Sequence, residues 1–278
     1  MEKFKIIGEI MKRIKKFMNY IIRDILIWKS YKTQAVLGIL SGFLGLLQFG
    51  FMGRFIAQGN YFPMIEQYGG NILAYFISGS VFMSYTTLSL TTFKSVIRQE
   101  QIMGTIEYLL LSETPLWEVF IYTIFSRLIF TIINTGIVFI FLIYTFDVEI
   151  KMNIISSIIL LVITMISLSG IGILSAGFII LTKKGDPISW VYSFLSGMFS
   201  GIYYPIEILP KWLRGISYIL PTTYAMDGLR KTLIKGYSLY EIKEDIIILI
   251  IMTAIILPIG IYWFKNSFDK ARKYGTIS

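Results

Sequence analysis

The sequence contains no cysteine and no histidine, and charged residues make up only 15% of its 278 residues. Without cysteine, the chain can form no disulfide, no thiolate metal site and no cysteine nucleophile. Without histidine, it lacks the commonest general base and the commonest protein metal ligand. Soluble domains average about 25% charged residues, which is well above the 15% of this chain. Hydrophobic residues make up 55% of the chain. The composition therefore predicts a membrane protein rather than one or two soluble domains.

Six stretches of the chain are long and apolar enough to cross a bilayer, which takes about 20 mostly apolar residues as a helix. We predict an all-α integral membrane protein whose six crossings lie at about 35–56, 71–93, 119–146, 154–181, 188–204 and 246–264. The fifth stretch is short and contains Ser and Gly, so its apolar character is the weakest of the six. Arg127 is the one charge well inside a crossing. We expect it to face a helix interface, a cavity or, by snorkelling, the headgroups.

The first 32 residues are expected to form an amphipathic helix that lies in the membrane interface. Between residues 4 and 27, Ile, Met and Phe recur at helical spacing, and Lys and Arg fill most of the other side of the helix. Such a helix places its apolar face among the acyl chains and its basic face among anionic headgroups. A soluble helix packed on another subunit is the alternative. We therefore divide the chain into an interfacial segment, 1–32, and a six-helix membrane domain, 33–278.

The distribution of Lys and Arg predicts which side of the membrane each end faces, because cytoplasmic segments are enriched in these residues. The first 32 residues carry nine of the 26 basic residues, and four more follow Phe264. An even number of crossings places both ends on one side, and we expect that side to be the cytoplasm. Six basic residues between Tyr203 and Asp245 run against this assignment. The net charge of +9 fits membrane anchoring, and we expect no nucleic acid partner.

A cytoplasmic segment, 95–115, is expected between the second and third crossings. Its sequence predicts a short helix from Arg98 to Met103, a hinge at Gly104 and a helix cap at Thr105. Acidic residues outnumber basic ones in this segment, whereas a loop lying on the membrane surface would more naturally be basic. The segment therefore suits docking to another protein. From the residues alone, a solvated charged loop is an equally good interpretation.

Prolines interrupt the segment 205–222, which follows the fifth crossing. Pro205, Pro210 and Pro221 forbid one continuous helix, and the apolar piece between the last two is too short to cross. We expect short re-entrant helices that enter the outer leaflet and return. Such backbone is tolerated at that depth only where protein or a water-filled cavity covers it, and a translocation path would provide this cover.

Both segments resemble the ABC-2 family, the membrane subunits of ATP-binding-cassette exporters. The earlier one is similar to the family's Glu-x-x-x-Gly-Thr-Leu-Glu stretch and reads, with Ile106 in place of Leu, Arg98-Gln-Glu100-Gln-Ile-Met-Gly104-Thr-Ile-Glu107. The later motif is an ordered series: Ser196-Gly197, Tyr204-Pro205, Leu209-Pro210-Lys211-Trp212-Leu213, Pro221-Thr222-Thr223-Tyr224 and Asp227-Gly228-Leu229-Arg230. The ordered series is much more specific than any one piece, and the resemblance covers essentially the whole chain.

The resemblance implies a homodimer, or a heterodimer with a second permease subunit, in contact with membrane lipid and docked on two separate ATP-binding subunits. The chain has no Gly-x4-Gly-Lys-Ser/Thr motif. ATP and Mg²⁺ would therefore be held by the partner ATPase, and this chain would have no catalytic residue, cofactor or metal. The resemblance assigns ATPase coupling to Arg98, Glu100, Gln101, Gly104, Thr105 and Glu107. It assigns the extracellular re-entrant segment near the exit to Pro205, Glu207, Pro210, Trp212, Pro221, Tyr224, Asp227 and Arg230.

The function that the resemblance implies is that of a permease subunit in the cytoplasmic membrane, not an enzyme. It would move an amphiphilic or hydrophobic cargo, such as a drug, a lipid or a lipid-linked glycan, out of the cytoplasm. The hypothesis about cargo rests on the interfacial helix and on the scarcity of charge within the crossings. An ATP-independent channel or secondary transporter is the first alternative, although the crossings lack the carboxylates typical of ion relays. A membrane enzyme acting on lipid, with Glu207 and Asp227 as an acid–base couple, is the second, although nothing in their spacing favours it.

Overall fold

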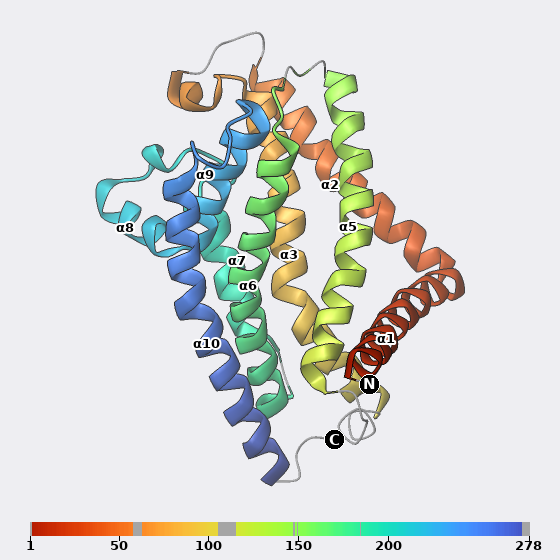
Figure 1. Ribbon diagram of the computed structural model, residues 1–278. Coiled ribbons are helices and arrows are strands. Elements are labelled where there is room, and N and C mark those ends of the chain that lie inside the picture. Colours follow the sequence, from red (N-terminus) through yellow and green to blue (C-terminus); the bar gives the residue numbers. More distant parts are fainter. Residues whose placement is uncertain are drawn as a thin grey trace.

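The computed structural model describes residues 2–57, 63–104, 115–146, 148, 150–183 and 185–273, which form a bundle of helices (Figure 1). The helices are α1 (Glu2–Ser30), α2 (Lys32–Ala57), α3 (Ile72–Met103), α5 (Leu116–Phe146), α6 (Ile154–Thr182), α7 (Pro187–Phe199), α8 (Lys211–Ile219), α9 (Pro221–Ile234) and α10 (Lys243–Lys273). Two short 3-10 turns lie between them, η1 (Pro63–Tyr68) and η2 (Ile206–Ile208). The described residues contain no strand, which confirms the all-α class predicted from composition.

Five helices of the described chain, α2, α3, α5, α6 and α10, are long and apolar enough to cross a membrane. Each has 26 to 32 residues, so at 1.5 Å per residue it exceeds a hydrocarbon core of about 30 Å. The predicted fifth crossing, at 188–204, does not form a helix of that length. Its helix, α7, has 13 residues and spans only about 20 Å. The structure therefore does not confirm six crossing helices.

The helix α7 ends at Phe199 because the residues that follow cannot continue it. Gly201 has a φ of +79°, in the left-handed region that glycine adopts most easily. Pro205 follows and has no N–H to donate to a helix. The chain then passes through η2 to α8, a helix of nine residues that lies between Pro210 and Pro221. The segment after α7 is thus a series of short helices.

The core of the bundle is built around α6, which packs most extensively on α10 and α3 (Figure 1). Glycines allow these backbones to touch. A Cβ built on Gly260 of α10 would lie 2.2 Å from the carbonyl oxygen of Gly170, and one on Gly172 would lie 2.6 Å from that of Ser89 on α3. By contrast, α5 packs mainly on α3, and most of α2 is exposed. The tightly packed part of the molecule is therefore α3, α6 and α10.

The helices run between two ends of the bundle, which are named the lower and the upper end after their places in Figure 1. The lower end holds the first turns of α1, the end of α3, the turn between α6 and α7 and the last turns of α10. The upper end holds η1, the end of α9 and the beginning of α10. Segments far apart in the sequence therefore meet at each end.

Candidate functional sites

A buried arginine joins three parts of the chain toward the upper end. Arg230 of α9 is 1% exposed and donates to the carbonyl oxygens of Gly201 (2.6 Å) and Ile202 (3.0 Å) in the turn after α7. Its guanidinium carbon lies 3.3 Å from the centre of the Tyr75 ring on α3. The Tyr75 hydroxyl donates to the same Gly201 oxygen at 2.7 Å. These four residues, the Arg230 clamp, hold the turn against α3 and α9.

Beside the clamp, two aspartates share one lysine. The Lys231 Nζ lies 2.7 Å from Asp227 Oδ2 and 2.9 Å from Asp245 Oδ2, and the Tyr68 hydroxyl of η1 donates to Asp227 Oδ1 at 2.6 Å. Burial and the neighbouring Asp227 carboxylate raise the pKa of Tyr68 well above its usual value, so the hydroxyl stays protonated and can donate. Asp227 is thus held by an ion pair within α9 and by a hydrogen bond that ties η1 to α9.

Residues of the expected exit segment meet at a small polar cavity of about 140 Å³. Those that line it are Pro205, Glu207, Tyr224, Asp227 and Arg230. Glu207 accepts a hydrogen bond from Gln67 at 3.4 Å, which is a different partner from those of Asp227. Glu207 and Asp227 therefore line the same cavity, and no hydrogen bond between the two carboxyl groups is present among the described residues.

The remaining residues of that segment lie away from the cavity. Pro210 precedes the first residue of α8, and Pro221 is buried as the first residue of α9, where its missing N–H costs no helix hydrogen bond. Trp212 lies on α8 with 78% of its surface exposed. An exposed Trp on a short helix is typical of a membrane interface.

At the lower end, the last turns of α3 are attached to the turn between α6 and α7. Lys94 forms an ion pair with Asp186, and Arg98 donates to the carbonyl oxygen of Lys183 at 2.8 Å. Burial opposes ionisation of Asp186, but hydrogen bonds from Lys94 and two serines outweigh it and hold the pKa of this carboxyl below its usual value. A displacement of α3 at this end would therefore be passed to α6 and α7.

The helix α3 continues without a break through the position of the predicted short helix and ends at Gly104. Gly104 has a φ of +67°, and its N–H donates to the Gln101 carbonyl oxygen at 3.2 Å, an arrangement that glycine favours at helix ends. The buried side-chain amide of Gln101 has no hydrogen-bond partner among the described residues. Glu100 is half-buried in the last turn. Thr105 and Glu107 lie outside the described residues.

The first helix, α1, packs along the beginning of α5. Asp24 accepts a hydrogen bond from the Ser126 hydroxyl at 2.5 Å, and aromatic rings of the two helices lie against one another. On α5, Arg127 is partly buried against α3 and donates to the hydroxyl oxygen of Ser95 at 2.5 Å. The α1 helix is thus attached to α5, while several of its apolar side chains remain exposed.

A groove of about 660 Å³ between α2 and α3, the polar groove, carries polar side chains on two crossing helices. They are Ser41, Gln48, Ser80, Ser84 and Thr87, with Tyr203 from the turn after α7. The serine hydroxyls donate to carbonyls of their own helices. Within the described chain, the exposed side chains of Gln48 and Thr87 make no hydrogen bond. An amide left unpaired in hydrocarbon is costly.

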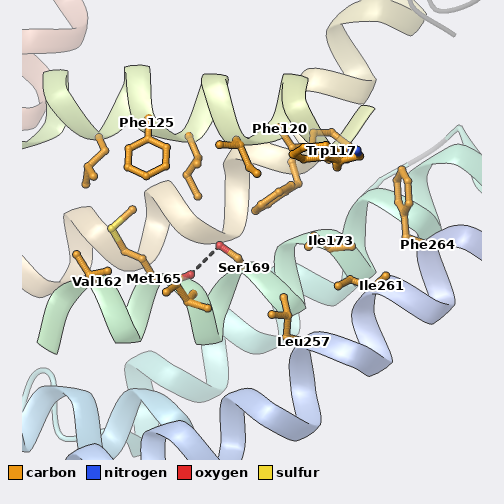
Figure 2. A pocket seen from close by; sticks show the side chains of 15 residues that line it. Trp117, Phe120, Phe125, Val162, Met165, Ser169, Ile173, Leu257, Ile261 and Phe264 are labelled. Carbon is orange, nitrogen blue, oxygen red and sulfur yellow. Dashed lines mark hydrogen bonds between the residues drawn. The ribbon is translucent and has the colours of Figure 1, made fainter. Parts of the chain in front are cut away.

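A second groove, the apolar groove, has a volume of about 680 Å³ and separates α5 from α6 and α10 (Figure 2). Side chains of α5, among them Phe125, face Met165 of α6 and Leu257 of α10 across it. The Ser169 hydroxyl donates to the Met165 carbonyl oxygen at 2.7 Å, so it is satisfied within α6. Trp117 lies at one end of the groove. A cavity of this size and apolarity is in the range of sites for drug-sized ligands.

Sequence reasoning missed the residues that complete the polar cluster near the upper end. They are Tyr68, Tyr75, Lys231 and Asp245. The spacing of Asp227 and Lys231, four positions apart, is a local signal that places both on one helix face. The two tyrosines have no such signal, because their partners lie on other helices.

Comparisons with known proteins match most of the chain. The sequence model of the family described as "ABC-2 type transporter" matches residues 15–234. The chain is 24% identical over 181 residues, 65% of its length, to the "Probable multidrug ABC transporter permease YbhR" of Escherichia coli (strain K12), of which the match covers 49%. It is 28% identical over 104 residues, 37% of its length, to the "Linearmycin resistance permease protein LnrN" of Bacillus subtilis (strain 168), of which 27% is covered. The chain thus spans about half the length of the first of these curated relatives and less of the second.

Proposed function

We propose that this chain, which belongs to the ABC-2 type transporter family, is the permease subunit of an ATP-driven exporter in the cytoplasmic membrane. Two separate ATP-binding-cassette subunits per complex would hold ATP and Mg²⁺ and supply the hydrolysis. The family match over residues 15–234 is the observation that carries the proposal. The family is that of the membrane component rather than the ATPase, which agrees with a sequence that has no phosphate-binding loop motif.

The cargo that we propose is amphiphilic or hydrophobic: a drug, a lipid or a lipid-linked glycan. One relative is named for multidrug transport and the other for linearmycin resistance. The apolar groove supports this class of cargo, because its lining offers hydrophobic contact and very few hydrogen-bonding groups. Export from the cytoplasm is part of the same proposal.

We further propose six passages through the membrane, with the lower end of the bundle in the cytoplasm. The helices α2, α3, α5 and α6 alternate in direction between the two ends, and α10 runs in the same direction as α6 (Figure 1). The remaining passage would be made by α7 and α9 together, joined at the turn that the Arg230 clamp holds. The short helix α8, with its exposed Trp212, would lie in the outer interface near the exit.

The polar groove supports a second permease subunit, identical to this chain or related to it. Most of α2 is exposed, and the unpaired side chains of Gln48 and Thr87 lie on the same side of the molecule. Polar groups within a bilayer are retained where another helix or a water-filled path meets them. A second subunit across this groove would cover α2 and enclose a path for the polar part of the cargo.

Contact with the ATPase is proposed at the lower end of α3. Arg98, Glu100, Gln101 and Gly104 lie there, and Thr105 and Glu107 follow in the sequence. Because Lys94 and Arg98 attach this end of α3 to the turn between α6 and α7, a push on it would reach the core of the bundle. The interfacial helix α1, packed on α5, would move with the beginning of that helix.

The proposal is tested by purifying the tagged chain from native membranes in mild detergent and identifying bound proteins by mass. We expect an ATP-binding-cassette ATPase in stoichiometric amount. ATP hydrolysis by the complex is then compared for Glu100→Ala, Glu107→Ala and the double variant. Loss of an interfacial charge contact costs about 1–2 kcal/mol, so we expect about 5- to 30-fold weaker ATPase association.

Glu244→Ala is the matched control, because Glu244 is an exposed carboxylate in the first turn of α10, at the opposite end of the bundle. It should leave association and hydrolysis unchanged. A chain that is recovered repeatedly without an ATPase and without ATP hydrolysis would favour an ATP-independent channel or secondary transporter. A double variant that no longer inserts into membranes would show that Glu100 and Glu107 stabilise the fold instead.

A further inference from the structure

The apolar groove offers a bound molecule almost no hydrogen-bonding group. The Ser169 hydroxyl is satisfied by the Met165 carbonyl, and the other lining side chains are apolar apart from the Trp117 indole at one end. A ligand with polar atoms would lose their hydration in this groove without compensation. A hydrocarbon chain has no such atoms and gains from burial. The lining therefore selects a hydrocarbon.

We expect the open side of the apolar groove to face the bilayer. Phe125, Ile166 and Ile261 line the groove and are still 46 to 51% exposed, on crossing helices whose outward faces contact acyl chains. Trp117 is the second residue of α5, which begins at the lower end (Figure 1), and the exposed Lys265 follows the lining residues of α10. Trp and Lys are typical of the membrane interface. A molecule that enters from the membrane would have its tail in the groove and its polar end at the lower rim.

The two walls of the groove differ in how firmly they are held. The wall formed by α6 and α10 is held by backbone contact between Gly170 and Gly260. The other wall, α5, packs mainly on α3 and α1, and it begins directly after the segment that we assign to ATPase contact. Movement of that segment would shift α5 relative to α6 and α10 and change the width of the groove.

We propose that the apolar groove binds the hydrocarbon tail of the exported amphiphile, which reaches it from the cytoplasmic leaflet, and that the groove changes width with the state of the ATPase. The identification of this amphiphile as cargo rests on the proposed function. The tail site lies within one subunit and is separate from the polar groove between α2 and α3.

The test uses the chain with its co-purified partners in phosphatidylcholine nanodiscs, and a palmitate analogue with a diazirine at the end of its chain as the probe. Light attaches the probe to side chains in contact with it, and mass spectrometry of the digested chain locates the attachment. Ile166→Trp places an indole in the groove. Ile158→Trp is the matched control on the same helix, because Ile158 is 52% exposed against 46% for Ile166 but does not line the groove. Labelling is measured without nucleotide and with ATP and vanadate.

We expect labelling of groove side chains such as Met165 and Phe125 that saturates with probe concentration and differs between the two nucleotide states. Ile166→Trp should lower it about tenfold, because the indole displaces several methylene groups, and Ile158→Trp should leave it unchanged. Labelling spread without saturation over the lipid-facing side chains of α2 and α6 would overturn the tail site, as would equal loss in both variants. Saturable labelling that is equal in the two nucleotide states would refute the proposal that the groove changes width with the state of the ATPase. Saturable labelling in a preparation without ATP hydrolysis would overturn the exporter function and leave the tail site standing.

Discussion

Replacement of Arg230 by alanine should remove the clamp that holds the turn after α7 against α3. The change leaves the Ile202 carbonyl without the donor that it has in the structure, and an unsatisfied buried carbonyl costs about 1–3 kcal/mol. It also removes the stacking on Tyr75, worth about 2 kcal/mol at a desolvated site. The Gly201 carbonyl keeps the Tyr75 hydroxyl, and the desolvation penalty of the guanidinium is relieved in part. We expect a net loss of about 3 kcal/mol.

Thermal unfolding in detergent, followed by tryptophan fluorescence, measures this loss. For a chain of this length, 1 kcal/mol corresponds to about 2–4 °C in Tm, so Arg230→Ala should unfold about 6–12 °C lower. Arg230→Lys keeps the charge but lacks the planar guanidinium that reaches two carbonyls. Its Tm should lie between those of the wild type and Arg230→Ala. Tyr75→Phe removes only the hydroxyl and should cost about 1 kcal/mol. Lys211→Ala, at an exposed position of α8, is the control and should have no effect.

The reasoning is refuted if Arg230→Ala unfolds at the same temperature as Lys211→Ala. A second check compares Arg230→Ala and Tyr75→Ala, which removes the ring, with the double variant that carries both changes. The two side chains are in direct contact, so their effects should fail to add by at least about 0.5 kcal/mol. Strict additivity would show that the ring and the guanidinium stabilise the turn independently.

Two further predictions concern packing and charge. Gly260→Ala should cost about 1–3 kcal/mol or more in the same assay, since its Cβ would meet the Gly170 carbonyl oxygen at 2.2 Å; Gly38→Ala has open space around it and should not destabilise. Asp186→Asn should remove a dependence of the Tm on pH. Because the folded pKa of Asp186 is lowered, its ion pair with Lys94 stabilises the protein above about pH 4, and this is lost as the pH falls through the folded pKa. A wild-type Tm that falls no more steeply than that of Asp186→Asn between about pH 5 and pH 3 would contradict it.

Much of the fold was predictable because the length of an apolar run is a local property. The predicted stretches at α2, α3, α5, α6 and α10 are helices of crossing length, and the short helix α8 lies between Pro210 and Pro221, where no longer one fits. The fifth stretch, predicted as a short crossing at 188–204, is not confirmed as one crossing helix, because α7 ends at Phe199. Its residues are apolar as far as Tyr204, but the backbone leaves the helix before Gly201. Hydropathy does not register a turn that a distant arginine stabilises.

Candidate site residues were predictable only as members of a motif. Asp227 and Arg230 were named from an ordered series of short sequence pieces, without their partners. In the structure, Arg230 meets Tyr75 of α3, and Asp227 meets Tyr68 of η1. Neither tyrosine stands out among the 18 in the chain. The predicted roles in ATPase contact remain predictions for all six residues, and Thr105 and Glu107 also lie outside the described residues.

The amino-acid order determined that this protein is helical, membrane-embedded and a member of its family, because transfer of side chains into a bilayer sums along each local stretch and the motif pieces are local as well. Only the tertiary structure decided that α5 stands apart from α6 and α10 across an apolar groove, and that one buried arginine joins α3, α9 and the turn after α7. These features depend on which helix faces meet across the bundle. The faces in contact are determined by packing across the whole chain, and a local sequence pattern does not specify them.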